Sequence, residues 1–277
     1  MNKFWKAALP AAGAVLALAG LTAFAVAPGK ATAAQKAPFV GRNFAHRGLH
    51  KTDKSVPENS LAAFRRAVER GYGIELDVHL TADDRLVVFH DDDLRRMCGV
   101  DGKLDTLRYP QIQDLRLGGT EERIPLLSQV LSVVDGRVPI ILELKRGSRN
   151  RELCAQVYDM LRLYKGDVCI ESFDPGIVRW WRKNAPEVLR GQLSCTVKKF
   201  GRSTGPVSAF FLSRLLTNFL GRPQFIAYGI CRTKPLTVRL CEKMGAMKVA
   251  WTSRSYVNEK RNDAVIFEFY RPRARYQ

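Results

Sequence analysis

Gly73-Ile74-Glu75-Leu76-Asp77-Val78-His79-Leu80 is the segment from which the architecture of this chain follows. Its apolar residues alternate with Glu75 and Asp77, and side chains on a strand point alternately to opposite faces. One face is therefore apolar, as in a buried strand, and the other carries two carboxylates. Neighbouring carboxylates repel each other unless a proton or a cation lies between them. A hard divalent cation such as Mg²⁺ or Ca²⁺ suits oxygen ligands, so Glu75 and Asp77 are predicted metal ligands.

A second segment, Ile140-Ile141-Leu142-Glu143-Leu144-Lys145, repeats the pattern. Glu143 and Lys145 share one face at the end of an apolar run, where charged residues are unusual in a plain core strand. Glu143 is predicted to complete the metal set, and Lys145 to neutralise a phosphoryl oxygen as a point charge. A salt bridge without a catalytic role is the alternative.

Strand-like and helix-like segments alternate about eight times, which predicts a (β/α)8 TIM barrel over residues 37–277. An open doubly wound sheet is the alternative, but no glycine-rich nucleotide loop supports it. Residues 91–125 are less regular and are expected to form a small insertion after the second strand. Strands are expected over residues 43–46, 73–80, 139–144, 168–171, 188–193, 225–228, 247–251 and 264–267, and helices over 61–70, 126–134, 151–164, 175–183, 207–219 and 234–245.

Two histidines lie at the ends of extended segments, next to charged residues. His46 is followed by Arg47, and His90 is followed by Asp91. Imidazole suits general acid–base catalysis near neutral pH, and the planar guanidinium of Arg47 matches a phosphate. His46 and His90 are therefore the candidate catalytic pair. His79 shares the face of the two carboxylates and ranks below them.

Four further residues are candidates for substrate contact, each with a simpler alternative. Glu58 precedes the helix expected at 61–70 and could act only on the helix dipole. Glu171 and Trp251 end the fourth and seventh expected strands, so in a barrel both would face the mouth. Trp251 and Phe173 are expected to form an apolar wall under a glycerol or lipid group, or simply to pack at the rim.

With these residues, the chain resembles the glycerophosphodiester phosphodiesterase family. The matching motifs, which occur in the right order, are His46-Arg47-Gly48, Pro57-Glu58-Asn59-Ser60, Ile74-Glu75-Leu76-Asp77-Val78, His90-Asp91, Leu142-Glu143-Leu144-Lys145, Glu171-Ser172-Phe173-Asp174-Pro175 and Val249-Ala250-Trp251-Thr252. The resemblance implies the barrel, its insertion, and one divalent metal on Glu75, Asp77 and Glu143. It also implies a general acid–base pair of His46 and His90, with Arg47 and Lys145 on the phosphate.

The activity that the resemblance implies is hydrolysis of a glycerophosphodiester to an alcohol and sn-glycerol 3-phosphate. Alternatives are a lysophospholipase D or another lipid phosphodiesterase on the same barrel, and a non-catalytic protein that binds anionic lipid or wall polymer. The end of the chain departs from the family, because few residues separate Trp251 from the last expected strand. No site role is therefore assigned to the acid at position 268.

Charge favours anionic partners. The chain of 277 residues has a formal net charge of +18, so a phosphate-bearing substrate and an anionic membrane surface are expected. Nucleic acid is not expected, since no motif for it is present. The apolar segment 209–220 is expected to pack on the barrel as a helix, or alternatively to dip into lipid beside Lys198 and Lys199. The six cysteines form no C-x-x-C pair and are expected to be free thiols.

The N-terminus is predicted to be a separate segment. Lys3 and Lys6 precede an uncharged run over residues 7–27, whose length is at the threshold for spanning a bilayer. Ala31-Thr32-Ala33 has the form of a signal-peptidase site. Residues 1–36 are therefore predicted to be an uncleaved anchor with a linker, or alternatively a cleaved secretory signal. The basic start favours a catalytic domain outside the cytoplasm, anchored to the membrane or secreted.

Overall fold

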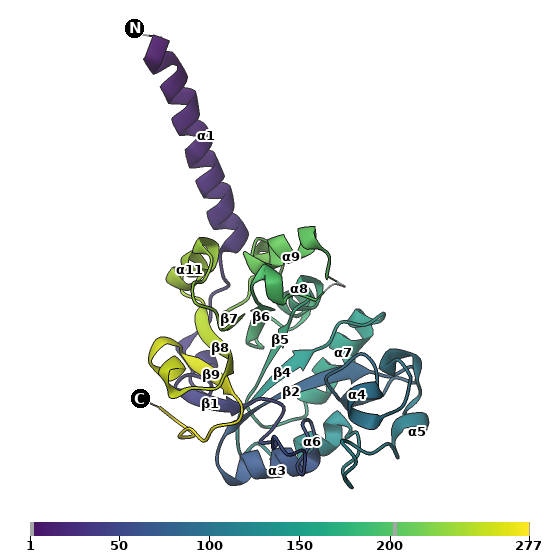
Figure 1. The fold of residues 1–277 in the computed structure, drawn as a ribbon. Coiled ribbons are helices and arrows are strands. Elements are labelled where there is room, and N and C mark those ends of the chain that lie inside the picture. The colour runs from purple at the N-terminus through teal and green to yellow at the C-terminus, as the bar shows by residue number, and fades with distance from the viewer. Residues whose placement is uncertain (1–2, 202–203, 277) are drawn as a thin grey trace.

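A computed structural model describes residues 3–201 and 204–276 of the chain and shows a closed barrel of eight parallel strands (Figure 1). Strand β1 pairs with β2 on one side and with β9 on the other, which closes the sheet. The barrel strands are β1 (Arg42–Ala45), β2 (Gly73–Leu80), β4 (Ile140–Leu144), β5 (Val168–Ser172), β6 (Arg190–Ser194), β7 (Phe225–Gly229), β8 (Met247–Ser253) and β9 (Ala264–Phe267). The predicted TIM barrel is confirmed.

Helices cover most of the outer surface of the barrel. They are α3 (Leu61–Glu69), α6 (Leu127–Val134), α7 (Asn150–Leu161), α8 (Pro175–Asn184), α9 (Pro206–Ser213), α10 (Asn218–Gly221) and α11 (Leu236–Lys243), with the 3-10 helix η4 (Tyr256–Arg261) before β9. After β9 the chain runs back, and the N–H of Tyr276 donates to the carbonyl oxygen of Gly41 (2.8 Å). The segment after β9 therefore lies beside β1, in the place where a last barrel helix would otherwise pack.

Side chains point alternately outward and inward along the strands, which creates one hydrophobic core under the helices and another inside the barrel. Ile74, Leu76 and Val78 point outward and pack under the helices. The inward side chains fill the barrel with Phe44, Ile141, Cys169, Phe225, Val249 and Ile266. Gly191 lies where a Cβ would come within 2.1 Å of the Phe225 ring, so only glycine fits there.

Between β2 and α6 the chain forms the expected excursion with a small core of its own. It contains β3 (Leu86–Val88), α4 (Arg95–Cys98), the 3-10 helix η1 (Leu104–Thr106) and α5 (Tyr109–Ile112). Strand β3 pairs antiparallel with the end of β2. This pairing anchors the excursion at the carboxyl end of β2 and brings His90, which follows β3, to the barrel mouth.

The prediction of one continuous helix over residues 207–219 is wrong. It is broken into α9 and α10, because Leu215 adopts a positive φ of 57° that an α-helix cannot continue through. The short 3-10 helix η2 (Val197–Lys199) precedes α9. Helix α9 therefore borders the barrel mouth, while α10 packs against α8.

Helix α1 (Lys3–Val26) projects away from the barrel in Figure 1 and meets it only at its carboxyl end. There Val26 is buried, and the guanidinium of Arg222 donates to the carbonyl oxygens of Phe24 (2.7 Å) and Ala27 (2.9 Å). Helix α2 (Ala33–Lys36) follows, and Phe39 stacks below Phe44 in the barrel.

Within the described part of the chain, no helix is sufficiently long and apolar to cross a membrane. The predicted transmembrane anchor is therefore not supported. The boundary at residue 36 stays a prediction, and residues 1–2 of the predicted segment lie outside the described residues. None of the six cysteines is joined in a disulfide.

Candidate active site

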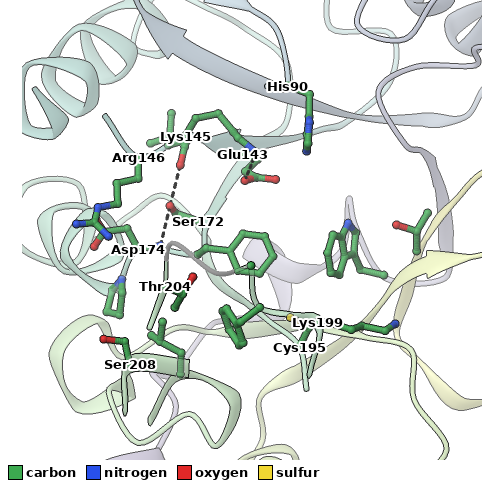
Figure 2. A pocket seen from close by; sticks show the side chains of 18 of the residues that line it. His90, Glu143, Lys145, Arg146, Ser172, Asp174, Cys195, Lys199, Thr204 and Ser208 are labelled. Carbon is green, nitrogen blue, oxygen red and sulfur yellow. Dashed lines mark hydrogen bonds and ion pairs between the residues drawn. The ribbon is translucent and has the colours of Figure 1, made fainter. Parts of the chain in front are cut away.

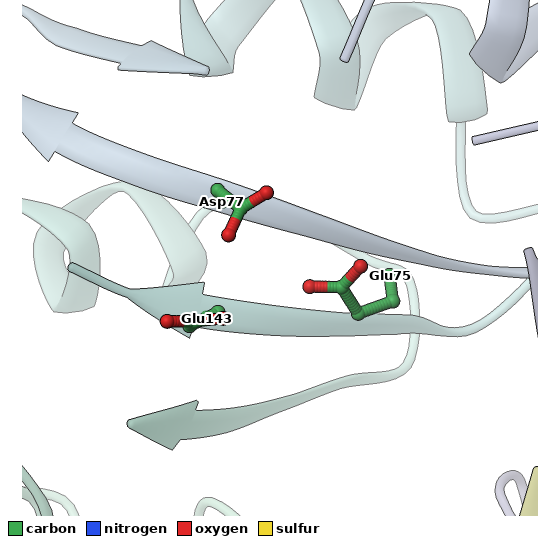
Figure 3. Close-up of side chains that lie close together, drawn as sticks. All are labelled: Glu75, Asp77 and Glu143. Atoms are coloured by element: carbon green, nitrogen blue, oxygen red, sulfur yellow. The ribbon is translucent and has the colours of Figure 1, made fainter. Parts of the chain in front are cut away.

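Three buried carboxylates form the centre of the candidate site. Glu75 and Asp77 lie on β2, and Glu143 lies on β4 in register with Asp77 (Figure 3). One oxygen from each lies within 4.8 Å of the others. Oxygen ligands of one Ca²⁺ at about 2.3–2.6 Å can be at most about 5 Å apart. The three side chains therefore fit a single hard divalent cation, as the sequence predicts.

The electrostatics of this cluster favour a bound cation. Burial, and then the charges of Asp77 and Glu143, raise the pKa of Glu75 well above its ordinary value. Burial also raises the pKa of Glu143, which the nearby ammonium of Lys145 only partly opposes. Burial opposes ionisation of Asp77 too, but Lys145 and the other neighbouring cations outweigh it and lower its pKa. A divalent cation would relieve the remaining repulsion.

His46 lies directly after β1 with its Nδ1 3.0 Å from Oε2 of Glu268. Burial raises the pKa of Glu268, but its hydrogen bonds with His46 and Arg254 outweigh this effect and lower the pKa of Glu268 to about 2. An ionised carboxylate can only accept, so Nδ1 carries the proton. Nε2 then has its lone pair free, and it lies 3.9 Å from Oε2 of Glu75. Burial lowers the pKa of His46 despite the bond to Glu268, which favours neutral imidazole.

His90 is also held through its Nδ1 by a carboxylate. Its Nδ1 lies 2.6 Å from Oδ1 of Asp91. The guanidinium of Arg96 on α4 holds Asp91 through Nε (2.5 Å) and Nη2 (3.1 Å), and it also reaches Glu58. Burial opposes ionisation of Asp91, but the bonds from His90 and Arg96 outweigh it and lower its pKa. Both histidines are thus fixed through Nδ1 by ionised carboxylates.

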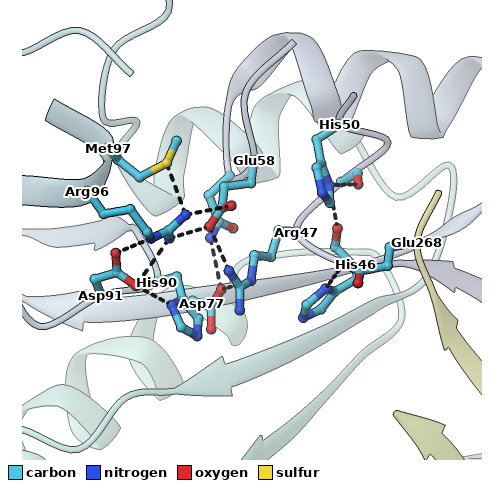
Figure 4. A network of polar contacts seen from close by, with 12 residues as sticks. His46, Arg47, His50, Glu58, Asp77, His90, Asp91, Arg96, Met97 and Glu268 are labelled. Carbon is cyan, nitrogen blue, oxygen red and sulfur yellow. Dashed lines mark hydrogen bonds and ion pairs between the residues drawn. The ribbon is translucent and has the colours of Figure 1, made fainter. Parts of the chain in front are cut away.

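Figure 4 shows the polar network that connects these groups, with His46 and His90 on either side of Arg47 and Asp77. The guanidinium of Arg47 donates to Glu58 (2.7 Å) and lies 3.5 Å from Asp77. Its backbone N–H donates to Glu75 (3.0 Å). Arg47 is therefore held at the carboxylate cluster, where a phosphate would meet a fixed positive charge.

Lys145 lies on the other side of the cluster. Its Nζ is 2.9 Å from Glu143 and 3.3 Å from Asp77. Burial disfavours the ammonium, but these two carboxylates outweigh it and raise the pKa of Lys145, so it stays charged. The salt bridge between Lys145 and Glu143 is therefore present, and neutralisation of a phosphoryl oxygen by Lys145 stays a prediction.

A cavity of about 1690 Å³ opens at this end of the barrel. Of the predicted site residues, it is lined by His90, Glu143, Lys145, Phe173 and Trp251. Figure 2 shows His90 and Glu143 on one side of the cavity and Thr204, Ser208 and Lys199 on the opposite side.

Glu171 is placed differently from the expectation. Its carboxyl group is completely buried beside Glu143, and neither oxygen has a hydrogen-bond partner. Burial and the negative charge of Glu143 raise its pKa well above the ordinary value. The structure does not bring Glu171 to the cavity, so its contact with substrate stays a prediction. His79 is buried, and its Nε2 donates to the carbonyl oxygen of His90 (3.4 Å).

Three residues that sequence reasoning did not assign complete the site. Glu268 follows the last strand, Arg96 lies in the insertion, and Asn59 donates to Asp77 (2.8 Å). The next residue, Ser60, caps α3 by accepting from the N–H of Ala63 (3.1 Å). An acid directly after the last strand is the signal that could have identified Glu268.

Comparison with known proteins agrees with this geometry. Residues 46–269 match the model of the glycerophosphoryl diester phosphodiesterase family. The chain belongs to this family. As a member it is a hydrolase of glycerophosphodiesters, and the resemblance noted in the sequence is confirmed.

Individual relatives show how far the family likeness extends. A glycerophosphodiester phosphodiesterase from Caldanaerobacter subterraneus subsp. tengcongensis is 30% identical over 222 residues, which cover 75% of this chain and 84% of that protein. Lysophospholipase D GDPD1 from Rattus norvegicus is 32% identical over 144 residues, and the match spans 47% of this chain and 44% of the relative.

A crystal structure of a glycerophosphodiester phosphodiesterase from Parabacteroides distasonis matches the family fold with a TM-score of 0.66 at 26% identity. The match covers 83% of this chain and 93% of that one. Barrel and family therefore extend over most of the described residues.

Proposed function

We propose that this protein hydrolyses glycerophosphodiesters to an alcohol and sn-glycerol 3-phosphate in a metal-dependent reaction, with His46 and His90 as the general acid–base pair. One observation carries the proposal. Two imidazoles, each fixed through Nδ1 by an ionised carboxylate, flank the carboxylate cluster of Glu75, Asp77 and Glu143. This leaves Nε2 of each histidine available for proton transfer.

Glu75, Asp77 and Glu143 are the residues that would hold one divalent cation, either Mg²⁺ or Ca²⁺. A bound cation would supply positive charge for the nonbridging oxygens of the phosphodiester. Arg47 and Lys145 add fixed positive charges on either side of the cluster. Charge that develops at phosphorus is stabilised where these donors are already oriented.

The two histidines differ in their surroundings, which suggests their roles. Burial lowers the pKa of His46, which favours its neutral form, so we assign it as the base. It removes the proton from the nucleophile, which is the glycerol 2-hydroxyl of the substrate. His90 lines the open cavity and protonates the departing alkoxide. The 2-oxygen bonds to phosphorus as the bond from phosphorus to the headgroup oxygen breaks, which gives a cyclic phosphate. Water then adds to phosphorus and the bond from phosphorus to the 2-oxygen breaks, which leaves sn-glycerol 3-phosphate.

The test compares His46→Ala and His90→Ala on glycerophosphocholine, with and without EDTA. One lost acid or base is expected to lower the rate by about 10²–10⁴-fold. His50→Asn is the matched control, because His50 bonds only to the carbonyl oxygens of His46 and Gly48 and asparagine retains a donor. Full activity of either alanine variant, or turnover that survives chelation, would contradict the proposal.

A second substrate separates the roles of the two histidines. In glycerophospho-p-nitrophenol the leaving group needs no protonation. His90→Ala is therefore expected to recover most of its activity on this ester, and His46→Ala is not. The opposite pattern would reverse the assignment.

The wider expectations about location also belong to this proposal. Contact with an anionic membrane surface stays a prediction, supported by the net charge of +18. A position outside the cytoplasm also stays a prediction, which rests on Lys3 and Lys6 at the start of the chain. The complete set of catalytic side chains favours catalysis over the alternative of a non-catalytic binding protein.

A further inference from the structure

Glu171 is buried inside the barrel without a hydrogen-bond partner. Its side chain is fully excluded from solvent, and neither carboxyl oxygen has a partner in the described part of the chain. No other acidic side chain among these residues has a buried oxygen without a partner. Burial of an unpaired polar group costs folding free energy, so native proteins pair nearly all of them. A ligand bound beside Glu171 would supply the missing partner.

The direction of Glu171 follows from its strand. Cys169, two residues earlier on β5, packs in the core inside the barrel, whereas Ile170 packs in the core under the helices. Side chains alternate along a strand, so Glu171 points inward. It is in register with Glu143 on β4, which is one of the three predicted metal ligands. The carboxyl group of Glu171 therefore lies in the barrel interior beside the carboxylate cluster.

The neighbours of Glu171 on its other flank are apolar. Strand β6 pairs with it through Gly191, which has no side chain that could offer a hydrogen bond. The ring of Phe225 on β7 covers Gly191 so closely that no Cβ fits there. The flank towards the carboxylate cluster is therefore the one on which Glu171 can meet a polar partner.

The cations of the site are already engaged with other carboxylates. Nζ of Lys145 lies 2.9 Å from Glu143 and 3.3 Å from Asp77. The guanidinium of Arg47 lies 3.5 Å from Asp77. Neither cation supplies a hydrogen bond to Glu171. A fourth carboxyl group beside three others calls for further positive charge, which a divalent cation on the cluster would bring.

Glu171 lies outside the set of direct ligands. The carboxylates that each place one oxygen within 4.8 Å of the others are Glu75, Asp77 and Glu143. Glu143 lines the cavity and Glu171 does not, so Glu171 faces the cluster from the inner side. One water extends the reach of a carboxylate by a hydrogen bond of about 2.7–2.8 Å. Mg²⁺ usually keeps several waters when carboxylates bind it, so a water can join Glu171 to the cation.

We propose that Glu171 is an outer ligand of the divalent cation and accepts a hydrogen bond from a water of its hydration shell. This inference rests on the proposed function, since it concerns the cation that Glu75, Asp77 and Glu143 would bind. The contact fixes the water and adds negative charge behind the cation. Mg²⁺ gives up its waters reluctantly, whereas Ca²⁺ takes more oxygens from the protein itself. Glu171 therefore supports binding of Mg²⁺ more than binding of Ca²⁺.

Calorimetric titration of the chelator-treated full chain with Mg²⁺ and with Ca²⁺ measures both affinities directly. Glu171→Gln keeps the size of the side chain and removes its charge. We expect this variant to bind Mg²⁺ about 10–100-fold more weakly, as is typical when an outer partner of a metal site is removed. Its affinity for Ca²⁺ is expected to fall by only a few fold.

Cys169→Ala is the matched control, because Cys169 lies on the same inward face of β5 and is equally buried. It is expected to bind both cations like the native protein and to unfold at a lower temperature, since it leaves a small cavity. In EDTA, Glu171→Gln is expected to be no less stable than the native protein, since it removes a negative charge beside Glu143. A purely structural role of Glu171 would not separate stability from cation affinity in this way.

The outcomes separate this inference from the proposed function. If cleavage of glycerophosphocholine needs a cation and Glu171→Gln binds Mg²⁺ as tightly as the native protein, the inference is overturned and the proposed function stands. Equal losses of affinity for Mg²⁺ and Ca²⁺ also overturn it, because Glu171 would then act only through its charge. If the native protein binds neither cation, the metal requirement of the proposed function fails, and the inference fails with it.

Discussion

At the scale of single residues, the two histidines are held in closely similar ways. Glu268 orients His46 and is itself held by Arg254, while Asp91 orients His90 and is held by Arg96. Each carboxylate fixes the imidazole tautomer, and each guanidinium keeps its carboxylate ionised. The supports come from opposite parts of the chain, one after the last strand and the other from the insertion.

Substitution of Glu268 tests this role. Glu268→Gln keeps the size of the side chain but no longer requires the proton to be on Nδ1 of His46. We expect kcat/KM to fall by about 10–100-fold, as for other residues that orient a catalytic group, with a changed acidic limb in the pH profile. The measurement is kcat/KM against pH.

Arg254→Lys serves as the control for this prediction, because a lysine can still pair with the carboxylate of Glu268. It is expected to change the rate by only a few fold. An unaltered pH profile in Glu268→Gln would show that the carboxylate does not act through His46.

At the scale of elements, the loop after β1 is tied to the insertion through Glu58. Its carboxylate accepts from Arg47 (2.7 Å) in the loop and from Arg96 (2.7 Å) on α4. Burial opposes ionisation of Glu58, but the two guanidinium groups outweigh it and lower its pKa from 4.5 to about 2. Glu58 therefore links two loops of the mouth, and its contact with substrate stays a prediction.

This link predicts a pH-dependent loss of stability in Glu58→Gln. A pKa lowered from 4.5 to about 2 corresponds to at most about 3 kcal/mol. Because the folded pKa is the lower one, the contribution is complete above about pH 4.5 and is lost as the pH falls towards 2. Urea unfolding of both proteins at pH 7 and at pH 3 measures the difference.

Glu121→Gln is the matched control for Glu58→Gln, since Glu121 pairs with Arg116 on the exposed surface of the same insertion. It is expected to change stability little at either pH. A destabilisation by Glu58→Gln that is equally large at pH 3 would mean that the effect comes from packing and not from the charge.

At the scale of the whole molecule, closure of the barrel brings several carboxylates together in the buried interior. Glu75, Asp77, Glu143 and Glu171 all face inward near one another. This arrangement costs folding free energy unless protons or cations compensate it. The same arrangement is what a divalent cation requires, so stability and metal binding are coupled through it.

We therefore expect Mg²⁺ or Ca²⁺ to raise the unfolding temperature. At 100 times its dissociation constant, a ligand adds about 2.7 kcal/mol, which is about 5–10 °C for a chain of this size. EDTA is expected to remove the increase, and Glu75→Gln to abolish it. Without a cation, Glu75→Gln should be at least as stable as the native protein, because it removes a buried repulsion.

Asp114→Asn, an exposed acid in the insertion, is the control for the metal experiment and is expected to show the full increase. Differential scanning calorimetry with each cation measures these shifts. A shift of the same size in Glu75→Gln would place the cation elsewhere.

The sequence alone determined the barrel and most of its centre. Period-two alternation in residues 73–80 and 140–145 assigns Glu75, Asp77 and Glu143 to the inner face, because side-chain direction on a strand is a local property. The order of the motifs identified the family, and the ends of the strands located His46 and His90.

Only the tertiary structure decided which groups support these residues and what shape the mouth has. The contact of His46 with Glu268 joins positions 222 residues apart, and it exists only because β1 and β9 close the barrel. The break at Leu215 and the resulting place of α9 beside the cavity depend equally on packing. Local preferences set the direction of each side chain, whereas contacts between distant residues depend on how the complete chain fills space.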